Sequence, residues 1–295
     1  MDDQSSTLVK IHTLTNRFEA DILMDALQQE DIPAILKCFE ETPYTGLFVT
    51  QRGWGQILVP SEFEYRARQI IWPVLHGVQT GRLCLDSSEL DPLLWDRLRE
   101  ADPRKICRQA LVGYEEEKNA FVVPFLTGRF LCLPDEERIE PIHAVPSHKP
   151  DFQFHLAMLH YLLEASEVEP SGNWIGEKEI PSGESFFRGP HAFPVQMLAD
   201  EFGSRPALFS AACLSLGGRE VDMGDMAYRL MPFPRIPILL VLWEGDDEFE
   251  SVLHVRFDET IVHQLHNLDT IWALVNTVCS SLDSAAGQIT GEEKQ

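Results

Sequence analysis

The hydrophobic pattern of the chain is clearest in residues 231–258. Residues 236–243 are almost uniformly apolar, as in a strand that is buried on both faces, and residues 252–257 alternate between apolar and polar. The stretch between them is acidic and contains Gly245, a residue that favours turns. The pattern predicts a β-hairpin whose apolar arm is the central strand of a sheet and whose acidic turn is solvated.

Runs of strand and helix signals fill the rest of the C-terminal half. Thr127 and Gly128 separate two apolar runs, which predicts a second hairpin. Asp151 begins a strongly apolar helix. Because the elements come in runs without βαβ alternation, the pattern favours an α+β domain with a mainly antiparallel sheet. Further helices are predicted over residues 194–202 and 206–216, and two short ones from Thr260 and Asp269.

The N-terminal residues predict a second, smaller unit. Asn16 and Glu19 form a capping box at the start of an amphipathic helix, and Ser61 and Glu64 repeat this signal before another helix. Strand signals precede and separate the two helices, which indicates a small α+β unit with helices on one side of a sheet. The predicted strands are residues 8–12, 35–39, 47–50 and 56–59.

Two stretches of this N-terminal unit carry a resemblance to a known family. LVKIHTLTNRFEADILMDALQQEDIPA and GQILVPSEFEYRARQII resemble a small family of proteins described as prokaryotic signal transducers. The resemblance covers about residues 7–76 and implies the ferredoxin-like fold of PII regulators. It does not extend to a nucleotide ligand, because the nucleotide-binding residues of PII and a Gly-rich phosphate loop are absent.

The C-terminal half resembles a second family. NWIGEKEIPSGESFFRGP, PFPRIPILLVLWEGDDEF and VRFDETIVHQL are similar to an uncharacterised domain family of anaerobic bacteria and archaea. The resemblance covers about residues 95–282. Relatives that carry iron–sulfur or corrinoid-type modules imply a metabolic accessory role, although this chain has no cysteine module. The family supplies no catalytic residues, and no cofactor is assigned.

These patterns predict four segments. A ferredoxin-like domain spans residues 7–76, and a turn-rich linker spans 77–94. A larger α+β domain spans 95–282, and residues 283–295 are expected to form a flexible tail.

The chain has a formal net charge of −23, from 47 acidic and 24 basic residues. Such a charge repels phosphate backbones, so nucleic acid is an unfavourable partner. The first residues lack the apolar core of a signal peptide, and the longest apolar run is too short to span a bilayer. We therefore expect a cytoplasmic protein that does not bind a membrane.

Four residues near the C-terminal hairpin form the candidate metal site. His263 and His266 are three apart, which places them on one face of a helix, and His254 and Asp258 lie close in sequence. Two histidines and a carboxylate suit a transition metal. The alternative is that these histidines lie on the surface or are partly buried. The six cysteines form no CxxC pair, which excludes the usual zinc-ribbon and iron–sulfur spacings.

A Gly-rich loop with many aromatic residues is the candidate ligand site. Trp174, Phe187 and His191 lie in this loop, and Arg188 and Arg235 add positive charge. Aromatic residues in irregular backbone often line an apolar cleft. The alternative is that they only pack the loop onto the core. No GxSxG motif or identifiable base accompanies a Ser or Cys nucleophile, so no catalytic residue is assigned.

The sequence thus favours a cytoplasmic regulatory or accessory protein that binds a partner protein or a small ligand. An enzyme or metal-handling protein with its site in the C-terminal domain is the alternative. Edge strands in a ferredoxin-like unit also allow pairing between two copies, so a homodimer is an open possibility.

Overall fold

The computed structural model describes residues 8–14, 17–38, 55–64, 66–68, 70–71, 90–143, 150–246 and 249–292. The chain divides into two compact units, Met1–Leu85 and Asp86–Gln295. The division falls inside the predicted linker, most of which lies outside the described residues, as does the predicted strand at 47–50.

The N-terminal unit is a three-stranded antiparallel sheet with helices. β1 (Leu8–Leu14), α1 (Arg17–Gln29), β2 (Ile35–Cys38), β3 (Gly55–Pro60) and the 3-10 turn η1 (Ser61–Phe63) follow in order, and the strands are arranged β1-β3-β2. Alternate residues of β3 are buried, and they include Ile57 and Val59. Leu23 and Leu27 of α1 are fully buried, as the apolar stripe of that helix predicts.

A four-stranded meander forms the first part of the C-terminal unit. Its order is β4-β5-β6-β7, and every pair is antiparallel. The hairpin predicted around Thr127 and Gly128 is confirmed as β5–β6. Asp91, Asp102 and Asp151 each cap a helix by accepting a backbone N–H. The elements are α4 (Pro92–Glu100), α5 (Pro103–Ala110), β4 (Gly113–Glu115), η3 (Glu116–Lys118), β5 (Ala120–Phe125), β6 (Gly128–Leu133), η4 (Pro134–Glu136), β7 (Arg138–His143) and α6 (Phe152–Glu164).

A five-stranded antiparallel sheet forms the second part, in the order β8-β12-β11-β10-β9. β11 is its central strand, and all its residues except Trp243 are buried, which confirms the expectation for this apolar run. The elements are β8 (Trp174–Ile175), α7 (Gly183–Phe186), η5 (Gly189–His191), α8 (Val195–Phe202), α9 (Pro206–Ser215), β9 (Arg219–Val221), β10 (Met226–Phe233), β11 (Ile236–Trp243), β12 (Val252–Asp258) and η6 (Glu259–His263). The predicted α+β class with antiparallel sheets is confirmed.

Aromatic side chains join the two sheets. The ring of Phe125 lies 5.0 Å from that of Phe154 and 5.4 Å from that of Phe233, which in turn stacks on Tyr161 at 4.5 Å. These four residues come from β5, α6 and β10. The contacts make the C-terminal unit one packed body.

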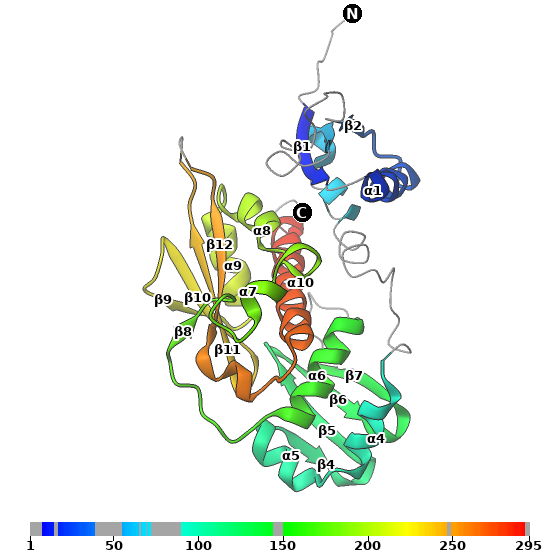
Figure 1. Cartoon of the computed structure of the whole chain (residues 1–295), viewed down its shortest axis with the longest axis vertical. Coiled ribbons are helices and arrows are strands. Elements are labelled where there is room, and N and C mark those ends of the chain that lie inside the picture. Colours follow the sequence, from blue (N-terminus) through cyan, green and yellow to red (C-terminus); the bar gives the residue numbers. More distant parts are fainter. Residues whose placement is uncertain are drawn as a thin grey trace, which may run out of the picture. The chain divides into compact units, whose positions relative to one another are not determined.

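The chain ends in a long central helix, α10 (Leu268–Glu292), which packs on α6, α8 and α9 (Figure 1). The sequence prediction of a short helix followed by a flexible tail was wrong for residues 283–292, which continue the helix. Leu282, Ala285 and Ala286 are buried, so packing holds this end of the helix in place. Within the described parts of the chain, no helix is both long and apolar enough to cross a membrane.

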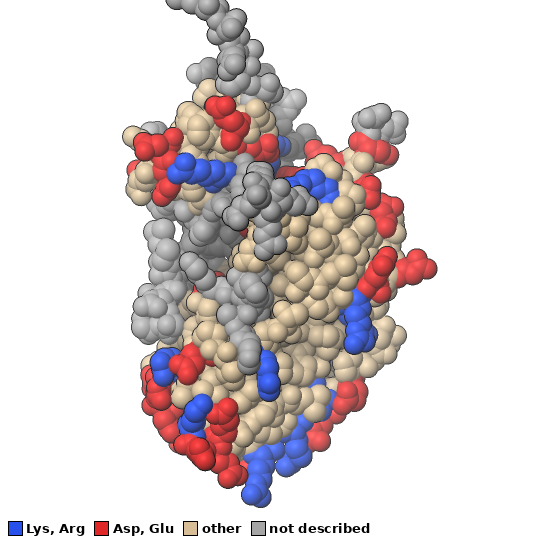
Figure 2. All heavy atoms as spheres, turned by 180° about the vertical axis from the view of Figure 1, so that it is seen from behind, with Lys and Arg blue, Asp and Glu red and all other residues tan. Residues whose placement is uncertain are grey.

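Acidic and basic side chains occur in several groups on the face drawn in Figure 2, with a broad uncharged area between them. The acidic excess of the sequence is therefore not gathered into one patch on this face.

Candidate functional site

The predicted ligand loop spans residues 174–193, and we call it the aromatic loop. Trp174 and Phe187, two of the predicted ligand residues, help to hold it against the core of the C-terminal unit. Trp174 packs against Ala227, Leu239 and Val241 on one face of the five-stranded sheet. Phe187 is only 7% exposed, and its ring lies 4.7 Å from that of Phe193. For these two residues the structure agrees with the alternative reading, in which the loop packs onto the core.

Gly183 shows how tightly this loop is packed. A Cβ atom at this position would clash with the carbonyl oxygen of Glu177 and would press on Ile180 and Phe187. We expect Gly183→Ala to lower the free energy of unfolding by about 1–3 kcal/mol, because the backbone must shift to admit the methyl group. Urea unfolding would measure the change, with Gly176→Ala as a control, because a Cβ atom at that position meets only ordinary contacts with two side chains. A Gly183→Ala protein as stable as wild type would show that the loop is loosely held.

Arg188 and His191 lie nearer the surface. Arg188 forms an exposed ion pair with Glu184, at 2.8 Å. The His191 ring stacks on Phe186, with centroids 4.3 Å apart, and meets the edge of Trp272 at 5.6 Å. The loop therefore reaches α10 through His191.

Two residues of α10 that lie outside the predicted sites have unusual polar surroundings. Trp272 and Asn276 are 7% and 1% exposed, respectively. The indole Nε1 of Trp272 and both amide atoms of Asn276 are buried and have no hydrogen-bond partner among the residues that the structure describes. The sequence signal for them is a Trp and an Asn, four residues apart, in the mostly apolar stretch 271–279 of this helix.

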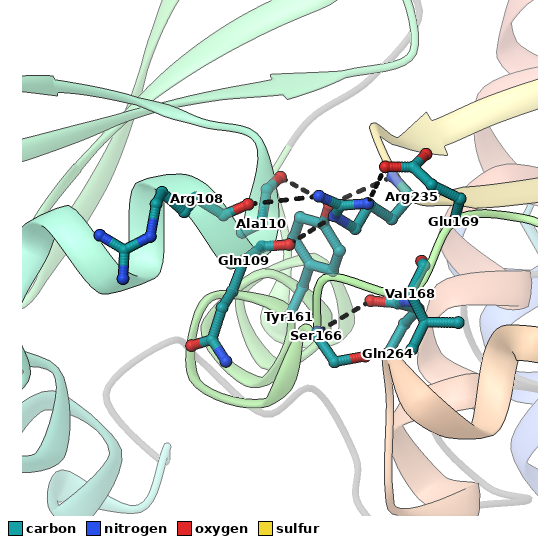
Figure 3. Close-up of polar contacts among 9 residues, drawn as sticks. All are labelled: Arg108, Gln109, Ala110, Tyr161, Ser166, Val168, Glu169, Arg235 and Gln264. Carbon is teal, nitrogen blue, oxygen red and sulfur yellow. Dashed lines mark hydrogen bonds and ion pairs between the residues drawn. The ribbon is translucent and has the colours of Figure 1, made fainter.

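Arg235 lies in a separate structural network (Figure 3). It is 4% exposed, and its guanidinium donates to the carbonyl oxygens of Gln109 (2.6 Å) and Arg108 (3.3 Å) at the end of α5. It also pairs with the exposed Glu169 at 2.6 Å, and its backbone N–H donates to the Tyr161 hydroxyl. No hydrogen bond joins Arg235 to the described residues of the aromatic loop, so it does not complete the predicted ligand site.

The predicted metal ligands are not brought together. His254 and His266 are exposed, whereas Asp258 is 1% exposed and forms part of the fold. His263 is also exposed, at the end of η6. Across the described ranges, no group of three His, Cys, Asp or Glu side chains could hold a metal ion.

Asp258 instead accepts a dense set of hydrogen bonds. The backbone and hydroxyl groups of both Ser171 and Thr260 donate to it, and so does the backbone N–H of Gly172 at 2.6 Å. Burial raises the pKa of Asp258, but these hydrogen bonds outweigh that effect and leave its pKa below the ordinary value. The carboxylate thus fixes the segment before β8 against the end of β12.

Three cysteines have no environment that would activate them as nucleophiles. Cys132, Cys213 and Cys279 are fully buried. Burial raises the pKa of the Cys279 thiol to about 12 and raises the other two as well. These thiols therefore stay protonated and serve as small apolar side chains.

The turn end of the β11–β12 hairpin carries an exposed apolar surface, which we call the hairpin surface. Trp243 and Val252 face each other across the two strands and are 47% and 38% exposed. Phe249 in the turn is 69% exposed. The backbone at Gly224 lies beside the Trp243 ring, which brings the exposed Met223 to the same end of the sheet.

Acidic residues surround this hairpin surface. They are Asp222, Asp225, Glu244, Asp246 and Glu250, and all five are exposed. Asp225 accepts a hydrogen bond from the backbone N–H of Glu244, which ties the β9–β10 turn to the end of β11. The sequence pattern predicts only that this acidic turn is solvated and does not predict the apolar surface beside it.

Comparison with known proteins gives one match. The family described as domain of unknown function DUF3786 matches residues 102–281. No curated protein and no solved structure matches the chain. The matched region confirms an uncharacterised C-terminal domain family and does not include residues 7–76, whose resemblance stays a prediction. Because the match covers more than half of its length, the chain belongs to the DUF3786 family.

Proposed function

We propose that this protein is a cytoplasmic regulatory or accessory protein that binds a partner protein through the hairpin surface and catalyses no reaction itself. The observation that carries the proposal is the exposure of Trp243, Phe249 and Val252 at one end of the sheet. Large aromatic side chains dominate the energy of protein interfaces, and clustered exposed ones commonly mark binding sites.

The charges around the hairpin surface indicate the kind of partner. Asp222, Glu244 and Glu250 form no ion pair with other described residues, so their charge is available to a partner. A partner with an apolar pocket rimmed by Lys or Arg would complement this surface. A second copy of the chain fits less well, because it would bring the same acidic rim against itself.

The N-terminal unit is a second element of the proposal. Its strand order, β1-β3-β2 with β3 antiparallel to both neighbours, is that of the first three strands of a ferredoxin-like fold. This order supports, for residues 7–76, the fold that the resemblance to signal-transducing proteins implies. In our proposal this unit acts as a sensing or docking module.

Affinity capture with matched variants tests the proposal. Purified wild-type protein, the double variant Trp243→Ser/Phe249→Ser and the control Leu93→Ser would be used to capture proteins from a lysate of the source cells. Leu93 is 62% exposed on α4, so the control removes an apolar side chain of similar exposure elsewhere.

We expect one protein with a basic surface to be retained by wild type and by the control and to be lost with the double variant. Its retention should weaken as salt is raised, because screening reduces attraction between exposed charges. Equal retention by all three proteins, or no retained protein, would contradict the proposal. Light scattering of the purified protein would show whether a second copy is bound instead.

A further inference from the structure

The orphan polar atoms on α10 need an explanation of their own. Buried polar groups in folded proteins nearly always have a hydrogen-bond partner. Within the described parts of the chain, Trp272 Nε1, Asn276 Nδ2 and Asn276 Oδ1 have none. Leaving such groups unpaired destabilises a fold, so three of them in one place point to a bound molecule that pairs with them.

The three atoms belong to one site. Trp272 and Asn276 are four residues apart in α10, which places them one turn apart on the same face of the helix. Side chains in a helix lean toward its N-terminus, so the Asn276 amide leans toward the turn that carries Trp272. A single small molecule can therefore reach both side chains.

The aromatic loop connects this site to the surface. The Trp272 ring contacts His191, whose side chain is 36% exposed and stacks on Phe186. The loop has positive φ at Ser182 and Gly189, and nothing lies within 4 Å of a Cβ built at Gly189. The open bend at Gly189 lies two residues before His191, whereas the tightly packed Gly183 lies at the other end of the segment between these two bends.

The chemistry of the site selects the molecule. An indole N–H can only donate, whereas a carboxamide donates and accepts side by side. The carboxamide complements the cis-amide edge of a heterocyclic ring, and aromatic neighbours favour a flat molecule that stacks on them. Arg188 of the loop is exposed and paired with Glu184, and the His191 ring lies 3.8 Å from the Asp269 carboxylate, so nothing here favours an anion.

We propose that Trp272 and Asn276, covered by the loop at Phe186–His191, bind an uncharged planar nitrogen heterocycle through its amide edge. This site is separate from the hairpin surface, and the proposal does not depend on partner binding there. A bound water molecule would also pair with the three atoms, and the experiment below distinguishes the two.

The indole N–H resonance of Trp272 provides a direct readout. The chain has six tryptophans, and the missing cross-peak in a Trp272→Phe protein identifies this one in a proton–nitrogen NMR spectrum. Uracil, hypoxanthine and lumichrome would be titrated as probes. We expect at least one of them to shift this peak downfield in a saturable way, because the N–H gains an acceptor.

Variants on the same helix test the assignment. Asn276→Leu should bind the probe at least about tenfold more weakly, since each lost hydrogen bond in a desolvated site costs that order of affinity. Thr277→Val is the matched control, because the Thr277 hydroxyl is buried but already donates to the carbonyl of Ala273. We expect it to bind within about twofold of wild type. If Asn276→Leu does not fold, Trp272→Phe tests the same claim by the saturation-transfer signal of the probe.

Three results would overturn the proposal. The first is that none of the probes shifts the Trp272 peak at millimolar concentration. The second is an equal shift in the Asn276→Leu protein. The third is a water contact to the indole N–H that persists at saturating probe, which would show that only an ordered water occupies the site.

Discussion

Replacing Arg235 with methionine is expected to lower the free energy of unfolding of the C-terminal unit by about 2–5 kcal/mol. The methionine would keep most of the apolar volume but would leave the carbonyl oxygens of Gln109 and Arg108 without their donor. Each buried polar group that loses its partner costs about 1–3 kcal/mol. Urea unfolding followed by circular dichroism would measure the loss.

The matched control for this variant is Glu169→Gln. Glu169 is the ionic partner of Arg235, but its own side chain is 75% exposed, so solvent screens the pair. We expect this variant to change stability by less than about 1 kcal/mol. If instead Glu169→Gln were the more damaging change, the ion pair and not the capping of α5 would be the main role of Arg235.

A second large loss of folding stability is expected when Asp258 is replaced. Replacing it with asparagine removes the charge and leaves fewer acceptor positions for the donors of Ser171, Gly172 and Thr260. Hydrogen bonds to a charged group contribute about 1.5–3 kcal/mol each to stability, so we expect a loss of about 2–4 kcal/mol at neutral pH.

The effect of Asp258→Asn should depend on pH in a defined direction. The folded-state pKa of Asp258 lies below the ordinary value, which is about 4 in an unfolded chain. Its carboxylate therefore stabilises the fold fully above that pH, and this stabilisation is lost as pH falls through the folded-state pKa. The stability difference between wild type and variant should shrink between pH 7 and pH 3. A difference that stays constant would show that the charge of Asp258 contributes nothing.

The sequence predicted those parts of the fold that depend on local pattern. The apolar run of β11 identified the central strand, because a strand buried on both faces needs apolar residues throughout. The tail was mispredicted because the C-terminal part of α10 looks polar in isolation. Contacts with distant parts of the unit bury Leu282, Ala285 and Ala286 there.

The candidate sites were harder to predict, because they depend on contacts between distant residues. Arg235 appeared to be a free cation beside the aromatic loop, but it caps a helix about 126 residues earlier in the chain. Asp258 appeared to be a metal ligand, yet its partners at 171 and 172 lie more than 80 residues away. Asn276 gave only the signal of a polar residue in an apolar stretch, because the folded surroundings alone show that its amide has no partner among the described residues.

The most direct test of partner binding through the hairpin surface is a calorimetric titration of the captured partner with purified wild-type protein, Trp243→Ser/Phe249→Ser and Leu93→Ser. All three substitutions are at exposed positions, so each protein should keep its fold. We predict that the double variant binds at least about tenfold more weakly, which corresponds to about 1.4 kcal/mol, while Leu93→Ser matches wild type. Equal affinities for all three proteins would contradict the proposal that the hairpin surface is the binding site.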